Sequence, residues 1–237
     1  VYVDDVFSTY LYEGNGGTNT ITNGIDLDGE GGLVWIKSRS SADGHRLFDS
    51  ERNSINAASF VKPALQTNGT NANLNYQDGV TTFNSDGFKI QDLSGAGGFQ
   101  GNANGYEYVS WTFRKQPGFF DVVTYTGDGA SGRAISHNLG SVPGMMIVKR
   151  TSASEKWAVY HRSADASAPE DKYLVLNTTA AVADNDNIWN DTAPTSTQFT
   201  VGSDDMVNAS GYTYVAYLFA HDAQDFGTDS DEAIIKC

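Results

Sequence analysis

Two short stretches of the sequence combine aromatic rings with polar side chains, a combination that is typical of carbohydrate binding. Rings offer a flat apolar face, and amide and carboxylate groups can hydrogen-bond to sugar hydroxyls. The candidate binding residues of the two stretches are Trp157, Tyr160, His161, Trp189, Asn190 and Asp191. We expect Trp157 to be a core residue, because a histidine stands at its counterpart in the internal repeat described below. Trp189 lies in a polar stretch, so we expect it to be the exposed ring.

A third stretch has residues that could bind calcium. Asp26, Asp28 and Glu30 alternate with Leu27 and Gly29, and Ca²⁺ prefers closely spaced carboxylates on a glycine-containing loop. The stretch lacks the full twelve-residue loop of an EF-hand, and the second copy of the repeat has no carboxylate at this place. We therefore expect no resident cofactor, with Ca²⁺ at these three residues as the alternative.

Residue patterns of common catalytic sites are missing from the sequence. The four histidines are not accompanied by a Gly-x-Ser-x-Gly nucleophile elbow. The closely spaced acidic strand motif of laminarinase-type glycosidases is also missing, and the single Cys237 allows neither a disulfide nor a zinc motif. We therefore expect that the protein is not an enzyme.

The charge balance is acidic, with 15 Lys and Arg against 29 Asp and Glu and a formal net charge of −14. Nucleic-acid binders need clustered basic residues for phosphate contacts, and no basic stripe is present. No apolar run approaches the roughly 18 residues of a membrane helix. We therefore expect neither nucleic acid nor membrane among the partners.

A twelve-residue segment occurs twice with small changes. NANGYEYVSWTF begins at Asn102 and NASGYTYVAYLF begins at Asn208, 106 positions later (208 − 102). Other blocks match in the same order: Lys37 in LVWIKSRS corresponds to Lys149 in MMIVKRTS, 112 positions later (149 − 37). Several blocks in one order predict a tandem duplication, in which each copy has on the order of a hundred residues.

The segments between these blocks predict an all-β fold of two tandem antiparallel β-sandwich domains, of jelly-roll or lectin-like type. Short alternating or apolar runs are separated by Gly and Asn turns, and amphipathic helical runs are rare. The repeated first and last strands of each copy should pair with each other. The apolar runs 32–37 and 144–149 should be central strands, and Trp35 and Trp111 should be core residues.

The period sets the expected domain boundaries. Residues 1–117 and 118–225 are the two copies, and 226–237 contains the opening strand of a third copy, because 121 + 112 falls at Ala233 in an apolar stretch. A plain terminal strand at 230–237 is the alternative.

Several blocks resemble a repeated, uncharacterised β-domain in virion proteins of tailed phages, mostly marine and cyanobacterial ones. These proteins are usually labelled tail fibre or structural protein. The blocks are GGLVWIKSR, HRLFDSERN, YVSWTFRKQPGFFDVVTYTGDG, SHNLGSVPGMMIVKRT and YVAYLFAHD. The resemblance implies an extracellular, virion-bound protein that contacts other virion proteins and forms homo-oligomers, trimeric by analogy with phage fibres. It brings no catalytic residues.

The composition and the resemblance together favour a structural and adhesive module of a tail fibre or other appendage, presenting loops to a host cell-surface glycan. Two alternatives stay open. One is a tail-fibre depolymerase that cleaves surface polysaccharide, and the other is a purely architectural shaft or capsid-decoration protein without a ligand.

Overall fold

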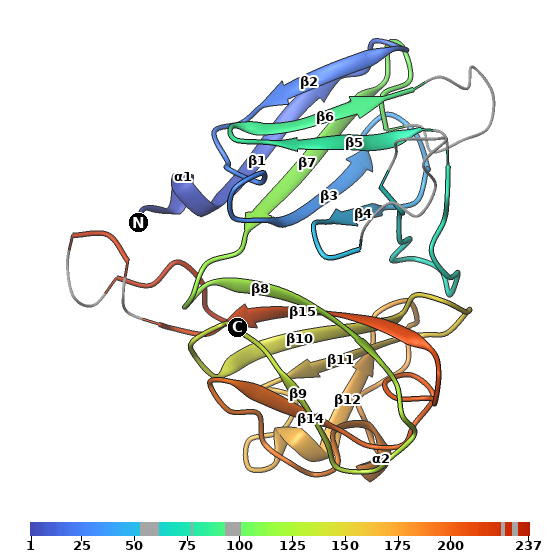
Figure 1. Cartoon of the computed structure of the whole chain (residues 1–237), viewed down its shortest axis with the longest axis vertical. Coiled ribbons are helices and arrows are strands. Elements are labelled where there is room, and N and C mark those ends of the chain that lie inside the picture. Colours follow the sequence, from blue (N-terminus) through green and yellow to red (C-terminus); the bar gives the residue numbers. More distant parts are fainter. Residues whose placement is uncertain (53–61, 77, 93–100, 224–225, 229–231) are drawn as a thin grey trace. The chain divides into compact units, whose positions relative to one another are not determined.

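The computed structural model describes residues 1–52, 62–76, 78–92, 101–223, 226–228 and 232–237 (Figure 1). The fold of these residues is mostly β, with only short helices, and the paired strands are antiparallel. Contacts divide the chain into unit 1, residues 1–67 and 73–115, and unit 2, residues 68–72 and 116–237. None of the helices in the described residues is long and apolar enough to cross a membrane.

Unit 1 contains two sheets and the short helix α1 (Val3–Val6) (Figure 1). The strands of the first sheet are, in spatial order, β1 (Phe7–Glu13), β7 (Glu107–Arg114), β3 (Gly32–Ser38) and β4 (Arg46–Asp49). The strands of the second sheet are, in spatial order, β2 (Thr18–Thr22), β6 (Gly87–Gln91) and β5 (Gly79–Asn84).

The predicted pairing of the first and last strands of unit 1 is confirmed, because β1 pairs antiparallel with β7 and places Tyr12 opposite Tyr108. The alternation of β7 turns Tyr108, Ser110 and Thr112 to one face, where each is completely buried. Tyr108 joins a buried cluster that includes Val34 of the first sheet and residues of the second sheet. The two sheets of unit 1 therefore share one core.

The expectation that Trp35 and Trp111 are core residues is wrong. Both are only half-buried and are absent from the core cluster. Strand alternation puts Trp111 on the face opposite Tyr108. There the two indole rings meet edge to face at 6.3 Å, and Trp35 Nε1 donates a hydrogen bond to His45 Nδ1 at 2.8 Å.

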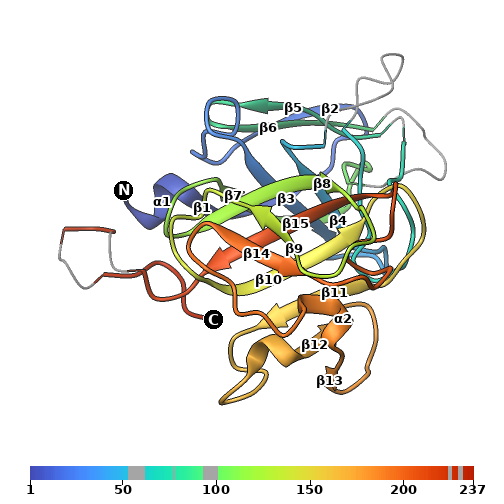
Figure 2. The same cartoon turned by 60° about the horizontal axis from the view of Figure 1, so that its bottom comes forward.

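Unit 2 also contains two sheets. The strands of the larger sheet are, in spatial order, β13 (Ala183–Asp184), β12 (Lys172–Val175), β11 (Trp157–His161), β10 (Pro143–Arg150), β15 (Thr213–Ala220) and β8 (Phe120–Thr126). The smaller sheet pairs β14 (Gln198–Val201) with β9 (Arg133–Ser136). Helix α2 (Asp186–Trp189) lies near β12 and β13, as Figure 2 shows.

The core of unit 2 lies between its two sheets and is closed by α2. Phe199 of β14 and Tyr214 of β15 belong to one buried cluster, together with Ile188 and Trp189 of α2. The predicted central position of the apolar run in this unit is confirmed, since β10 has hydrogen-bonded neighbours on both sides.

The opening strand of a third copy is expected in the C-terminal segment. Residues 232–237 form no strand, and they are fixed instead by single hydrogen bonds, such as Asp222 N to Ile235 O at 2.8 Å. A strand that opens a third copy, or a plain terminal strand, is therefore not formed by these residues. The predicted boundary at 225 falls at residues outside the described part of the chain.

Candidate functional site

An open cleft of about 430 Å³ lies in unit 2, where β10 begins and β11 ends. Four stretches of the chain supply its described walls, namely 142–143, 160–170, 193–194 and 221. Its described lining residues are Val142, Pro143, Tyr160, Arg162, Asp165, Ala166, Pro169, Glu170, Ala193, Pro194 and His221. A concave site of this size with converging polar groups is the usual form of a small-ligand site.

Tyr160 is the most buried polar residue in the described lining of the cleft. The residue is 4% exposed, and its ring meets that of Trp189 edge to face at 6.1 Å. None of the described residues hydrogen-bonds the hydroxyl group of Tyr160. This group is open to solvent at the cleft. Burial raises the pKa of Tyr160, and Glu170 raises it further while Arg162 lowers it. The hydroxyl group therefore stays protonated and can both donate and accept a hydrogen bond.

Two charged side chains of the cleft have no protein partner in the described part of the chain. Arg162 is exposed, and Glu170 is half-buried. The backbone of Arg162 is fixed, because its N–H donates to Gly144 O at 2.9 Å. The guanidinium and carboxylate groups are thus left for solvent or for a ligand.

Asp165 uses one of its two carboxylate oxygens for hydrogen bonds within the protein and leaves the other without a partner among the described residues. Oδ1 accepts hydrogen bonds from Ser167 N, Ser167 Oγ and Ala168 N at 2.9, 2.9 and 3.1 Å. These bonds, led by the one from Ser167 N, lower the pKa of Asp165. Asp165 is therefore ionised at neutral pH, and no described residue occupies Oδ2.

His221 and three prolines complete the cleft. His221 Nδ1 accepts a hydrogen bond from Cys237 N at 2.9 Å, so the neutral ring carries its proton on Nε2. Pro143, Pro169 and Pro194 give rigid apolar wall segments that lack backbone N–H donors. The cleft therefore offers apolar contacts beside donors and acceptors of both charges.

Further carboxylates lie near the Glu170 side of the cleft. The pKa of Asp191 is raised by desolvation and then by the charges of Asp171, Asp186, Asp184 and Glu170. One cation opposes this group, since Lys172 Nζ lies 2.6 Å from Asp184 Oδ2. The side of the cleft formed by Glu170 therefore has a negative potential.

Only one of the six residues predicted to bind a ligand lines this cleft, namely Tyr160. Trp157 and His161 lie on the opposite face of β11. Trp157 is fully buried, as expected, and its Nε1 donates to Gly69 O of the same unit at 3.0 Å. His161 Nδ1 accepts a hydrogen bond from Ser163 N.

The expectation that Trp189 is an exposed ring is wrong. It is 1% exposed, and its Nε1 donates to Lys172 O at 3.1 Å. Asn190 and Asp191 follow α2 in left-handed conformation, with φ of 56° and 44°. Asn190 Oδ1 accepts a hydrogen bond from Ser131 Oγ, whereas Asp191 is exposed. The structure therefore does not assemble these residues into one site with Trp157 and His161.

Sequence reasoning missed four polar residues of the cleft: Arg162, Asp165, Glu170 and His221. Arg162 and Asp165 lie in the connection directly after β11, and Glu170 lies in the short 3-10 helix η1 (Pro169–Asp171) that follows, within a stretch rich in Ala, Ser and Pro. Loops that follow strands often carry binding residues, so this position was the available signal. His221 follows the last strand of the unit and is brought close only by the folding of the sheet.

The predicted calcium loop is not assembled. No group of three or more His, Cys, Asp or Glu side chains is placed to hold a metal ion within the described ranges. Asp26 instead accepts a hydrogen bond from Gly29 N at 2.9 Å, and Asp28 and Glu30 are exposed. The stretch is a polar turn.

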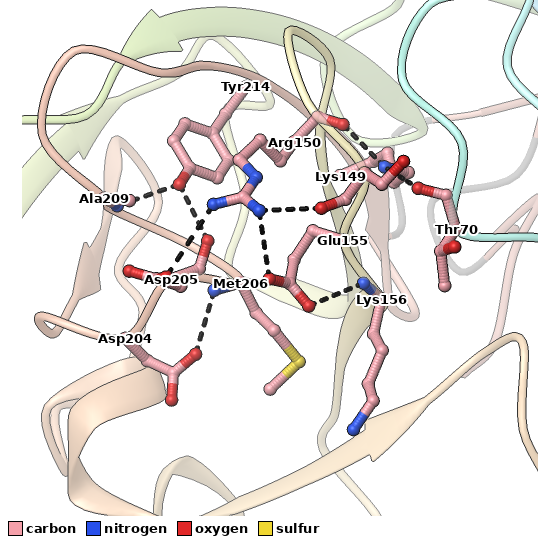
Figure 3. A network of polar contacts seen from close by, with 11 residues as sticks. Thr70, Lys149, Arg150, Glu155, Lys156, Asp204, Asp205, Met206, Ala209 and Tyr214 are labelled. Carbon is pink, nitrogen blue, oxygen red and sulfur yellow. Dashed lines mark hydrogen bonds and ion pairs between the residues drawn. The ribbon is translucent and has the colours of Figure 1, made fainter.

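A second concentration of charge in unit 2 is structural (Figure 3). Arg150 Nη2 donates to Ser154 O at 2.7 Å and lies 3.2 Å from Glu155 Oε2, while its guanidinium covers the Tyr212 ring at 4.6 Å. Nearby, the fully buried Lys149 donates to the carbonyls of Thr70 and Arg150. These contacts hold the β10–β11 turn and use Arg150 Nη2 and Lys149 Nζ within the protein, whereas Arg150 Nε is buried without a hydrogen-bond partner.

The fold and the cleft define a β-rich protein of two contact-defined units, with an open polar cleft in the second. The chain belongs to the family described as Domain of unknown function (DUF7483), whose model matches residues 3–227. The family model thus covers both units in one match. Comparison with the curated proteins gave no match, and comparison with the solved structures gave none either.

Proposed function

We propose that this chain is a structural and adhesive module of a phage virion appendage, such as a tail fibre, that binds a host cell-surface glycan through the cleft of unit 2. The phage assignment comes from the resemblance of sequence blocks such as GGLVWIKSR and YVSWTFRKQPGFFDVVTYTGDG. It places the protein outside the cell, on the virion, in contact with other virion proteins. Trimeric assembly follows by analogy with phage fibres, and the acidic charge of −14 argues against nucleic acid as a partner.

The observation that carries the glycan proposal is the hydroxyl group of Tyr160. It lies on a residue that is 96% buried (100 − 4), at an open cleft, and none of the described residues hydrogen-bonds it. A polar group so placed gains a partner when a hydroxyl-rich ligand binds. Arg162 and Glu170 beside it add a free donor and a free acceptor, while the prolines suit the C–H face of a sugar ring.

We also propose that the two units are β-sandwiches, of jelly-roll or lectin-like type, that arose by internal duplication. Matched contacts support this. Tyr12 Oη donates to Gly101 O and Tyr125 Oη donates to Val207 O, both at 2.6 Å. Each of these rings stacks on the tyrosine of the last strand with centroids 5.2 Å apart. Contacts repeated at this level of detail are hard to explain by convergence.

The test of the binding proposal is a glycan array probed with the intact chain and with the variant Tyr160→Phe. We expect a set of bound glycans, with affinity reduced about tenfold in the variant, because one hydrogen bond inside a cleft is lost. Tyr106→Phe is the matched control, since Tyr106 is 40% exposed in unit 1. A blank array with folded protein would favour the purely architectural alternative.

A depolymerase stays as the second candidate function because two carboxylates, Asp165 and Glu170, line the same cleft. Glycosidases use such a pair as acid and base or nucleophile. The test is the release of new reducing ends from host capsule or lipopolysaccharide, measured with wild type and Glu170→Gln. Release that disappears in the variant would replace the adhesive proposal with an enzymatic one.

A further inference from the structure

We propose that the cleft of unit 2 selects a saccharide that carries a free ammonium group, such as a 2-amino-2-deoxyhexose unit. The inference rests on the proposed function, because it names the kind of sugar that the same cleft takes. In this assignment the carboxylates of Glu170 and Asp165 receive the ammonium group. Arg162, Tyr160 and His221 bind hydroxyl groups of the sugar.

The two carboxylates have capacity that the protein does not use. Glu170 is half-buried and has no partner among the described residues, and Asp165 keeps Oδ2 unoccupied while Oδ1 accepts three hydrogen bonds. A partly desolvated carboxylate gains most from a ligand that brings both a positive charge and N–H donors. An ammonium group brings both, whereas a neutral hydroxyl brings only a donor.

The surrounding charges favour the same ligand. Arg162 is the one Lys or Arg side chain among the described lining residues, which also include the two carboxylates Asp165 and Glu170. Beyond Glu170, the carboxylates of Asp171 and Asp191 are close enough to interact, which contributes to the raised pKa of Asp191. An anionic sugar would be repelled by these carboxylates, which outnumber the two cations near them, Arg162 and Lys172.

The other groups of the cleft explain why the ligand is a sugar and not a simple amine. The hydroxyl of Tyr160 and the guanidinium of Arg162 can hydrogen-bond to sugar hydroxyls, which an alkylammonium ion lacks. The Nε2–H of His221 is a further donor, since Nδ1 is already occupied by Cys237 N. A pyranose ring presents several hydroxyls, and its apolar face fits against proline rings such as Pro194.

The experiment is isothermal titration calorimetry of the intact chain with three tetrasaccharides of one β-1,4-linked backbone: glucosamine, N-acetylglucosamine and glucose. At slightly acidic pH, where the amine is protonated, we expect the glucosamine tetramer to bind about tenfold tighter than either neutral one, from one charge-assisted contact. The preference should shrink at high salt and vanish when the pH is raised until the amine is neutral.

Glu170→Gln tests the assignment of the carboxylate. We expect the variant to bind the three tetramers with nearly equal affinity, while Glu13→Gln keeps the wild-type preference. Glu13 is an exposed carboxylate of β1 in unit 1 and does not line the cleft, so the control removes the same charge without changing the lining. If Glu170→Gln does not fold, the pH dependence of the preference in wild type decides the question.

The outcomes separate this inference from the proposed function. Equal or tighter binding of the neutral tetramers overturns the ammonium preference and leaves glycan binding intact. Binding of ethylenediamine as tightly as the glucosamine tetramer overturns the assignment of a sugar. Failure of all three tetramers overturns this inference, and only a blank glycan array in addition overturns the proposed function.

Discussion

The side chain of Asn208 holds the turn after β8 by a reciprocal contact with Asp128. Asn208 Nδ2 donates to Asp128 Oδ1 at 3.0 Å, and Asn208 Oδ1 accepts from Asp128 N at 3.1 Å. The same amide donates to Ala130 O at 2.8 Å. In unit 1, Asn102 makes the matching pair with Asn15, at 2.7 and 3.3 Å. Both asparagines are completely buried.

Asn208→Ala should therefore destabilise the protein by roughly 2–4 kcal/mol, because it removes several buried hydrogen bonds and leaves a backbone carbonyl without its donor. Urea unfolding followed by circular dichroism measures the loss. Asn102→Ala should give a loss of similar size. The exposed Asn104→Ala is the control and should change stability by less than about 0.5 kcal/mol. Wild-type stability of Asn208→Ala would contradict the structural role of the contact.

Gly14 lies where a strand end passes very close to another segment. A methyl group added at Gly14 would come within 2.2 Å of Ala103 O, whereas one added at the nearby Gly17 would meet nothing closer than 3.8 Å. We expect Gly14→Ala to cost several times more stability than Gly17→Ala, since backbone atoms must move. Thermal unfolding of the two variants side by side measures this. Equal melting temperatures of the two variants would show that the backbone at residue 14 has more room beside Ala103 O than the structure gives it.

Trp189→Phe should destabilise unit 2 by about 1–3 kcal/mol, and Trp189→Ala by about 3–5 kcal/mol. The indole is buried, donates to Lys172 O and packs against Tyr160. Loss of glycan binding in Trp189→Ala would therefore report damage to the core. Trp111→Phe is the control, since Trp111 is half-buried and outside the core cluster. Denaturant unfolding of both variants should show the larger loss at 189.

Several strands of this protein could be predicted from sequence because their signals are local, whereas β2, β5, β9 and β12 have no counterpart among the predicted segments. Alternation in β7 placed Tyr108 on one face and Trp111 on the other, and the repeated first and last strands of each unit pair as expected. Which of the two faces is inside is not a local property. The structure completely buries the face with Ser110 and Thr112, whereas the face with Trp111 is buried in part, at Val109.

The candidate site was harder to predict, because its residues come from segments far apart in the sequence. Arg162 and His221 meet at the cleft only through the order of β11, β10 and β15 in the sheet. Trp189 looked exposed because its neighbours are polar. The single turn of α2 instead directs Ile188 and Trp189 into the core while Asn190 faces outward.

His137 should make stability fall with decreasing pH. The side chain is 5% exposed, lies 6.4 Å from the Phe199 ring and accepts a hydrogen bond from Leu139 N at 3.2 Å. Burial lowers its pKa from the ordinary 6.5, against the opposing effect of Asp121. The unfolded chain therefore takes up a proton below about pH 6.5 that the folded state binds less readily. The contribution of neutral His137 to the free energy of unfolding is complete above about pH 6.5. It is lost as the pH falls through the lowered pKa of the folded state.

His137→Asn tests this, because asparagine can still accept from the N–H two residues later but cannot be protonated. We expect the difference in unfolding free energy between about pH 7.5 and pH 5 to be smaller in the variant than in wild type. Urea titrations at several pH values measure it. His161→Asn is the matched control: His161 makes the same type of bond to Ser163 N but is partly exposed. If the unfolding free energy of His137→Asn keeps the full pH dependence of wild type, groups other than His137 cause the loss of stability in acid.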